Sequence, residues 1–275
     1  MKTEKPKRVV VIGAGVAGLV AGYELKQRGH QPTILEAQNR VGGRIYTLRN
    51  FAPGLYAEAG AMRIPRTHRL TLEYCERFRL KMRTFVTGSP KGLVYVGGKR
   101  MTIEEANADP ERLPFELADH EHGRTADDLW QDAISDIRAL LERDGDAAWE
   151  EIARRYDQYS LYEFLKTKGF SEQAIEYFAI MNFVESDLNN AVLELLREDL
   201  GKAYMDMQEI EGGMDLLPNA FYAELQQEVR LGAEVYALDQ DERSVTAYFK
   251  TESGRFSVTA DYAICTVPFP VLRTI

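Results

Sequence analysis

The stretch Arg8-Val9-Val10-Val11-Ile12-Gly13-Ala14-Gly15-Val16-Ala17-Gly18-Leu19-Val20 decides the fold of this chain. Its β-branched run before Gly13 is typical of a central parallel strand that is covered on both faces. The three glycines have the spacing G-x-G-x-x-G: the first allows a tight turn, the second lets a pyrophosphate approach the backbone, and the third lets helix and strand pack closely. The stretch therefore predicts a strand, a turn and a helix whose N-terminus faces a pyrophosphate.

A second strand and an acidic residue complete a dinucleotide-binding pattern. Gly29-His30 ends the predicted helix, residues 31–35 are predicted to form a strand, and Glu36 follows that strand. A carboxylate about 20 residues after the glycines can accept hydrogen bonds from the ribose hydroxyls of an adenine dinucleotide. We therefore favour an α/β fold with a Rossmann-like domain over a purely structural glycine turn. No basic residue stands beside Glu36, which argues against NADP.

The composition narrows the class of protein. The chain has 275 residues, of which 45% are hydrophobic and 28% charged, with a net charge of −9. This acidic balance argues against nucleic-acid partners and against attraction to anionic membranes. The apolar run in residues 9–22 carries the glycine pattern, so it is interpreted as neither a secretory signal nor a membrane span. Two cysteines, Cys75 and Cys265, form no disulfide framework, and we expect a cytoplasmic protein.

A paired glycine between two arginines follows in Arg40-Val41-Gly42-Gly43-Arg44. Such glycines let the backbone pass close to a ligand, and guanidinium groups bind phosphates. A surface turn with incidental arginines is the alternative. Together, the glycine pattern, Glu36 and this arginine motif resemble the flavin amine oxidase superfamily, and bacterial L-amino-acid oxidases most. The resemblance implies that the cofactor is FAD, and it disfavours an NAD-dependent dehydrogenase.

The segment Gly54-Leu55-Tyr56-Ala57-Glu58-Ala59-Gly60-Ala61-Met62-Arg63-Ile64-Pro65 makes the resemblance more specific. It is similar to the segment that passes the flavin ring in L-amino-acid oxidases. In that family the arginine of Gly-x-Met-Arg-Ile-Pro clamps the substrate carboxylate, and the resemblance gives this role to Arg63. A planar guanidinium fork binds a carboxylate bidentately and so selects amino acids over plain amines. A surface arginine before a proline is the alternative interpretation.

The resemblance also implies a set of cofactor-binding residues, and for Val235 it implies a backbone hydrogen bond to the adenine. The set is Gly13, Ala14, Gly15, Ala17, Gly18, Glu36, Ala37, Arg40, Gly43, Arg44, Gly60, Ala61, Met62, Arg63 and Val235. No catalytic residue and no metal site are assigned. Glu198 aligns with a histidine near the active site of the venom L-amino-acid oxidases of this family. A carboxylate cannot play the part of that histidine without a shifted pKa. Either the site differs, or the alignment is one residue out of register.

Sequence patterns divide the chain into four segments. Residues 1–45 are predicted to be the first part of a discontinuous FAD-binding domain, and residues 205–275 its second part. Residues 46–102 would belong to a substrate domain, and residues 103–204 would be a helical insertion.

Several individual elements are also predicted. The patterns indicate a hairpin at 93–102, a helix over 126–143, a helix from a capping box at Ser160 to Lys168, a helix starting at Ser171, a helix over 219–229, a strand at 232–238, a hairpin at 244–260 and a buried strand at 261–268. Most aromatic side chains between residues 156 and 183 are expected to lie in the core.

The resemblance extends over the whole chain but over little more than the first half of a usual family member. The lysine that holds a water near flavin N5, the aromatic substrate cage and the C-terminal Gly-x-x-x-x-Ala-Gly-Glu segment of the family are absent from this sequence. We therefore expect a truncated chain, with unpaired strand edges and exposed apolar surface.

The predicted function is FAD-dependent L-amino-acid oxidation. The resemblance implies that Arg63 orients the amino acid, that a hydride leaves Cα for the flavin, and that the imino acid hydrolyses to a 2-oxo acid and ammonia while oxygen becomes hydrogen peroxide. The alternatives are a monoamine or polyamine oxidase, and an inactive FAD-binding fragment or half of a split enzyme. The predicted partners are the amino acid and either a second copy or a complementing C-terminal chain.

Overall fold

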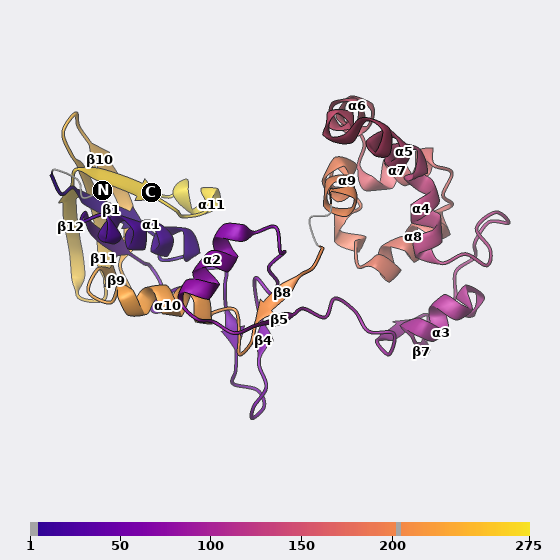
Figure 1. The fold of residues 1–275 in the computed structure, drawn as a ribbon, viewed down its shortest axis with the longest axis horizontal. Coiled ribbons are helices and arrows are strands. Elements are labelled where there is room, and N and C mark those ends of the chain that lie inside the picture. The colour runs from indigo at the N-terminus through magenta and orange to yellow at the C-terminus, as the bar shows by residue number, and fades with distance from the viewer. Residues whose placement is uncertain (1–4, 202–204) are drawn as a thin grey trace. The chain divides into compact units, whose positions relative to one another are not determined.

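The computed structural model describes residues 5–201 and 205–275, which form two compact units (Figure 1). The discontinuous unit contains the chain up to Phe85 and again from Asp206 to Ile275, and the helical unit contains Val86–Met205. In the described residues no helix is long and apolar enough to cross a membrane. Residues 86–102 fall in the helical unit, whereas the sequence grouped them with a substrate domain; the four-segment division stays a prediction.

A parallel sheet forms the centre of the discontinuous unit. Its strand order is β13 (Tyr262–Cys265), β1 (Arg8–Ile12), β2 (Gln31–Leu35) and β9 (Val229–Arg230). In Figure 1 the indigo N-terminal strand β1 accordingly lies among yellow C-terminal segments. Helix α1 (Val16–Gln27) connects β1 to β2, as the glycine pattern predicts. The α/β fold is confirmed, and the carboxyl ends of β1, β2 and β13 meet at one edge.

Strand β13 corrects one prediction, because the sequence indicated a buried strand. Tyr262 is 57% exposed, and Cys265 is exposed as well. Among the described residues β13 pairs with β1 alone, so it is the outer strand of the sheet. A short apolar run cannot reveal whether its strand is central or at an edge.

The two faces of the parallel sheet are covered by different elements. An antiparallel sheet of β10 (Glu234–Gln240), β11 (Val245–Thr251) and β12 (Gly254–Ala260) packs against Val10 and Ile12. Helices α1 and α10 (Leu216–Glu224) pack against the other face, through Val9 and Val11. The predicted hairpin at 244–260 is confirmed.

Shorter elements complete the discontinuous unit. They are β3 (Thr47–Leu48) paired with β4 (Ala57–Glu58), α2 (Arg69–Arg77), β5 (Met82–Thr84) paired with β8 (Gln208–Ile210), and α11 (Phe269–Leu272). The predicted helix over 219–229 is wrong in its bounds, because α10 begins and ends earlier and Val229 belongs to β9.

The helical unit has one hydrophobic core, which contains Trp130, Phe164 and Tyr177. It begins with the predicted hairpin, whose strands pair with each other. The elements are β6 (Leu93–Val96), β7 (Lys99–Thr102), α3 (Ile103–Ala108), α4 (Ala126–Ala133), α5 (Ser135–Asp144), α6 (Ala148–Tyr156), α7 (Leu161–Thr167), α8 (Glu172–Asn182) and α9 (Val192–Leu200), with single 3₁₀ turns at Pro110–Arg112, Gly145–Ala147 and Glu185–Asp187.

Local signals predicted these helices unevenly. Ser160 and Ser171 begin α7 and α8, as expected, and Ser160 forms a capping box with Glu163. The helix predicted over 126–143 is instead two helices. Ser135 donates from Oγ to the carbonyl of Asp132, 2.8 Å away, at the break, where such a bond competes with the helical pattern. Phe183 is 82% exposed, unlike most of the aromatic residues expected in the core.

Candidate functional site

The glycine turn after β1 is tightly packed at Gly13 and Gly18 and open at Gly15. Gly13 has φ +98° and donates its N–H to the carbonyl of Leu35, 2.8 Å away. A Cβ built on Gly18 would lie 1.9 Å from the carbonyl oxygen of Gly13, so only glycine lets α1 approach β1 this closely. A Cβ on Gly15 would meet nothing within 4 Å. The open side of the turn at Gly15 therefore leaves room for a ligand.

The N-terminus of α1 points into this space without a side-chain cap. Gly15 is the N-cap residue, and no acidic residue stands in the first turn. The first helical hydrogen bond runs from Leu19 N–H to the carbonyl of Gly15, over 2.9 Å. Uncapped N–H groups and the positive end of the helix dipole bind anions such as a pyrophosphate.

Glu36 lies directly beside the turn, although 22 residues separate it from Ala14 in the sequence. The residue is only 8% exposed. One carboxylate oxygen accepts the N–H of Ala14 at 2.7 Å, and the other accepts the N–H of Gln38 at 2.8 Å. Each oxygen keeps a second lone pair, so the fixed carboxylate can still accept a hydrogen bond from a ribose hydroxyl.

The strand that carries Val235 starts at the same place. Ala233 donates its N–H to the carbonyl of Glu36 at 2.7 Å, and Gly232 donates to the carbonyl of Gln38 at 3.0 Å. Val235 itself is 8% exposed and lies at a β-bulge in β10. The structure thus brings its backbone to the side of the turn where Glu36 lies.

The arginine motif packs onto the glycine turn. Gly42 donates its N–H to the carbonyl of Ala14 at 2.9 Å, and a Cβ on Gly43 would lie 3.3 Å from Cα of Gly15. The two glycines have φ +100° and +56°, which side chains rarely adopt. A pair of glycines is therefore required for this contact.

The two arginines of the motif differ. The guanidinium of Arg40 donates to the carbonyl of Gly43 at 2.9 Å and lies 4.4 Å from the centre of the Tyr46 ring, so it supports its own loop. Arg44 is exposed, and across residues 5–201 and 205–275 its guanidinium makes no hydrogen bond or ion pair. Arg44 is thus the better placed of the two to bind a phosphate.

The segment with Arg63 runs antiparallel to the arginine motif. Ala59 donates its N–H to the carbonyl of Tyr46 at 2.8 Å, and a Cβ on Gly60 would lie 1.9 Å from the carbonyl oxygen of Arg44. Buried Ile64 exchanges backbone hydrogen bonds of 2.7 and 2.9 Å with Gln208. The exposed Arg63 therefore stands on a segment whose backbone is fixed on both sides.

Sequence reasoning missed Thr266. Its N–H and its hydroxyl both donate to the carbonyl of Ile12, at 2.9 and 2.8 Å. The hydroxyl oxygen would lie 2.9 Å from a Cβ on Gly13 or on Gly18. Thr266 follows the end of β13, and ligands of such sheets bind at the carboxyl ends of the strands, which is the signal that could have revealed it.

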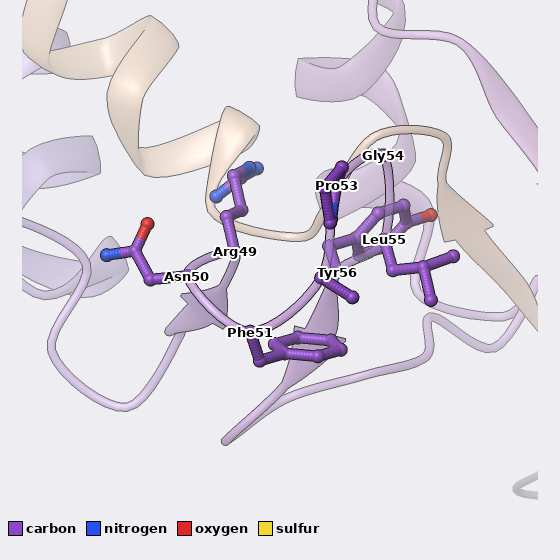
Figure 2. A pocket seen from close by; sticks show the side chains of 8 residues that line it. Arg49, Asn50, Phe51, Pro53, Gly54, Leu55 and Tyr56 are labelled. Atoms are coloured by element: carbon purple, nitrogen blue, oxygen red, sulfur yellow. The ribbon is translucent and has the colours of Figure 1, made fainter.

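Two cavities of the discontinuous unit are lined by residues outside the glycine turn. One of about 530 Å³ is lined by residues 49–56 in the loop between β3 and β4, and contains none of the predicted site residues (Figure 2). Another of about 470 Å³ is lined by Met62, Tyr56 and Arg83, among others. Met62 belongs to the predicted cofactor-binding set, whereas no residue of the glycine turn lines either of these two cavities.

Two further observations concern other chemistries. Burial raises the pKa of the Cys75 thiol to about 11, so this cysteine packs as a small apolar side chain, as predicted, and does not act as a nucleophile. Among the described residues no group of three or more histidine, cysteine or acidic side chains could hold a metal ion.

Comparisons with known proteins identify relatives of this chain. A family model described as flavin containing amine oxidoreductase matches residues 16–275. The protein YobN of Bacillus subtilis (strain 168), provisionally named an L-amino-acid oxidase, is 36% identical over 98% of this chain and 57% of its own length. An L-amino acid oxidase of Cerastes cerastes is 36% identical over 96% of this chain and 52% of its own length. The chain thus spans about half the length of the curated relatives it matches.

Solved structures of putrescine oxidase share the fold. The wild type bound to putrescine aligns with a TM-score of 0.65 and 20% identity, over 98% of this chain and 60% of that chain. A triple mutant with redesigned cofactor binding gives a TM-score of 0.66 over the same shares. At this identity the likeness shows the fold and not the substrate.

Proposed function

The chain belongs to the flavin-containing amine oxidoreductases, whose cofactor is FAD, and on that premise we propose that it serves the oxidation of L-amino acids. The products would be 2-oxo acids, ammonia and hydrogen peroxide. Curated relatives named as L-amino-acid oxidases support this substrate class. Because the chain spans about half of their length, the activity is proposed for the protein that carries these residues.

The observation that carries the proposal is the stacking of three backbone segments. The glycine turn contacts Gly42 and Gly43, and the arginine motif in turn contacts Gly60. Arg63 follows three residues later on an anchored segment. This arrangement supports a guanidinium held close to the cofactor, where it can bind a carboxylate.

The residues at the glycine turn fit FAD. The open space at Gly15 and the uncapped N-terminus of α1 would receive the pyrophosphate, with Arg44 beside it, and Glu36 would bind the ribose. When bound, FAD supplies the redox chemistry by accepting a hydride from the substrate. The chain itself supplies position: Arg63 would fix the substrate carboxylate and so direct the Cα–H bond toward the flavin.

Three finer statements belong to the same proposal. The other predicted cofactor contacts, from Ala17, Ala37, Arg40, Ala61, Met62 and Val235, are proposed from the family resemblance. A second copy or a complementing chain is proposed as a partner. A cytoplasmic location is proposed because neither cysteine is paired: Cys75 is buried and Cys265 is free and exposed.

A visible absorption spectrum of the purified protein tests the proposal. We expect a bound flavin spectrum that bleaches when an L-amino acid is added without oxygen and stays unchanged with the amine that its decarboxylation would give. Bleaching by the amine instead would favour a monoamine or polyamine oxidase. A colourless protein that takes up no added FAD would contradict cofactor binding by this chain alone.

A further inference from the structure

The turn that leads into helix α10 is bound by side chains from a distant hairpin and not by a side chain of its own. Its N-cap residue, Asp215, makes no side-chain cap. The N–H of Met214 instead donates to Glu58 at 2.8 Å, and the N–H of Asp215 donates to the hydroxyl of Thr47 at 3.2 Å. A carboxylate at this end also interacts favourably with the helix dipole. Thr47 thus accepts the N–H of the N-cap residue, and Glu58 accepts the N–H of the residue before it.

Glu58 and Thr47 are held in place by contacts with each other and with the turn. Thr47 and Glu58 are paired across β3 and β4, and the Thr47 hydroxyl donates to Glu58 at 2.8 Å. Thr47 is 5% exposed. Arg49 binds both carboxylate oxygens of Asp215 at 2.7 Å, and in Figure 2 its side chain points away from the loop toward the ribbon of this turn. A Cβ on Gly213 would lie 2.8 Å from Cγ2 of Thr47, so the turn before α10 fits tightly against the hairpin.

The first turn of α10 supports the arginine motif. Pro218 lies in that turn, and a Cβ on Gly42 would be 3.2 Å from Cγ of Pro218. On its other side, Gly42 donates its N–H to the carbonyl of Ala14 in the glycine turn. The position of α10 therefore determines where the arginine motif meets the turn.

The same carboxylate supports the segment with Arg63. Glu58 ends β4, two residues before Gly60, and Gly60 packs on the carbonyl of Arg44. A displaced Glu58 would release both the turn before α10 and the strand from which residues 60–63 continue.

We propose that Glu58 is a positioning residue: by binding the turn that leads into α10 it holds the arginine motif and the Gly60–Arg63 segment against the glycine turn. The part that concerns Arg63 rests on the proposed function. The part that concerns the glycine turn requires only that FAD is the cofactor, whatever the substrate.

The first test compares FAD affinity in Glu58→Ala, Glu58→Gln and the control Glu163→Ala. Glu163 also accepts one backbone N–H and one hydroxyl, both from Ser160, but in the helical unit. Titration of the apoprotein, followed by flavin fluorescence, should give about tenfold weaker binding for E58A, equivalent to about 1.4 kcal/mol. E58Q keeps an acceptor for Met214 and should stay within about threefold of wild type. E163A should lose about as much thermal stability as E58A does but should bind FAD as tightly as wild type.

The second readout is amide hydrogen exchange without FAD. E58A should speed exchange at both Met214 and Gly42, whereas E163A should change neither. Faster exchange at Met214 alone, or unchanged FAD affinity in E58A, would overturn the proposal. If wild type binds no FAD, the proposed function fails, but the exchange at Gly42 still decides the role of Glu58. If E58A does not fold, Thr47→Val replaces it. This variant should bind FAD about threefold more weakly and exchange faster at Gly42. Wild-type values of both would overturn the proposal.

Discussion

Gly15 and Gly18 differ in what a methyl group would meet, which predicts opposite effects of alanine. At Gly15 the backbone has φ −66° and the added Cβ has open space, so G15A should change the free energy of unfolding by less than about 0.5 kcal/mol. It should still weaken FAD binding about tenfold or more, because the Cβ occupies the approach of the pyrophosphate. At Gly18 the Cβ collides with the carbonyl of Gly13, and G18A should destabilise the protein by about 3 kcal/mol.

Chemical denaturation together with FAD titration checks this pair. Normal FAD affinity in G15A would show that the open side of the turn does not face the cofactor.

Arg63 is predicted to affect substrate binding more than cofactor binding. Replacing it by alanine should raise KM for L-amino acids about 10- to 100-fold, since a charge-assisted bidentate pair contributes about 1.5–3 kcal/mol. R63K keeps the charge but loses the fork and should recover only part of the affinity. Steady-state oxygen consumption measures both, with the exposed Arg66→Ala three residues later as the control. Equal KM values for wild type and R63A would remove Arg63 from the substrate site.

The sequence predicted the positions of some site residues and not of others. The glycine spacing and Glu36 were located in advance because neighbouring residues impose their geometry. The contact between Glu36 and Ala14 follows from two parallel strands that end together. Thr266 and Glu58 could not be located, since their partners are 254 and 156 residues away in the chain and no local pattern records such a contact.

At the scale of elements, the start of α8 depends on a buried carboxylate. Glu121 is 1% exposed and accepts the N–H and the hydroxyl of Ser171, each at 2.7 Å, and the N–H of Ala118 at 2.8 Å. Burial alone raises the pKa of Glu121, but these hydrogen bonds outweigh it and hold the pKa below the ordinary value of 4.5.

This lowered pKa predicts a pH dependence of stability. The stabilisation by Glu121 is fully present above the pKa of the unfolded state and is lost as the pH falls through the lower pKa of the folded state. Glu121→Gln should therefore destabilise the helical unit by about 1–2 kcal/mol at about pH 6, and the difference from wild type should shrink toward about pH 3. Urea unfolding followed by circular dichroism at each pH measures it, with the exposed Glu116→Gln as control. A difference that is constant with pH would contradict the assignment.

Helix starts marked by a local capping residue were predicted correctly, and elements defined by distant contacts were not. The capping residues Ser160 and Ser171 lie next to the helices that they start. By contrast, α10 begins before the predicted residue 219, after a turn whose amides at Met214 and Asp215 donate to the distant Glu58 and Thr47. The exposure of β13 also depends on which strands flank it, and not on its own residues.

At the scale of the whole molecule, the two units have separate hydrophobic cores, one of them around Trp130 and Phe164 and another around Leu19 and Phe221. We therefore expect two transitions in calorimetry. FAD at 100 times its Kd should stabilise only the discontinuous unit, by about 2.7 kcal/mol. A single transition that shifts as a whole with FAD would contradict separate unfolding of the units.

The sequence by itself determined the α/β class, the glycine turn, the acidic residue at the end of the second strand and the family, because each depends on residue types at short, fixed spacings. Only the tertiary structure decided that the arginine motif rests on the glycine turn and that Glu58 binds the turn before α10. Those contacts join segments that are far apart in the chain, and they form only when the sheet and its covering helices have packed.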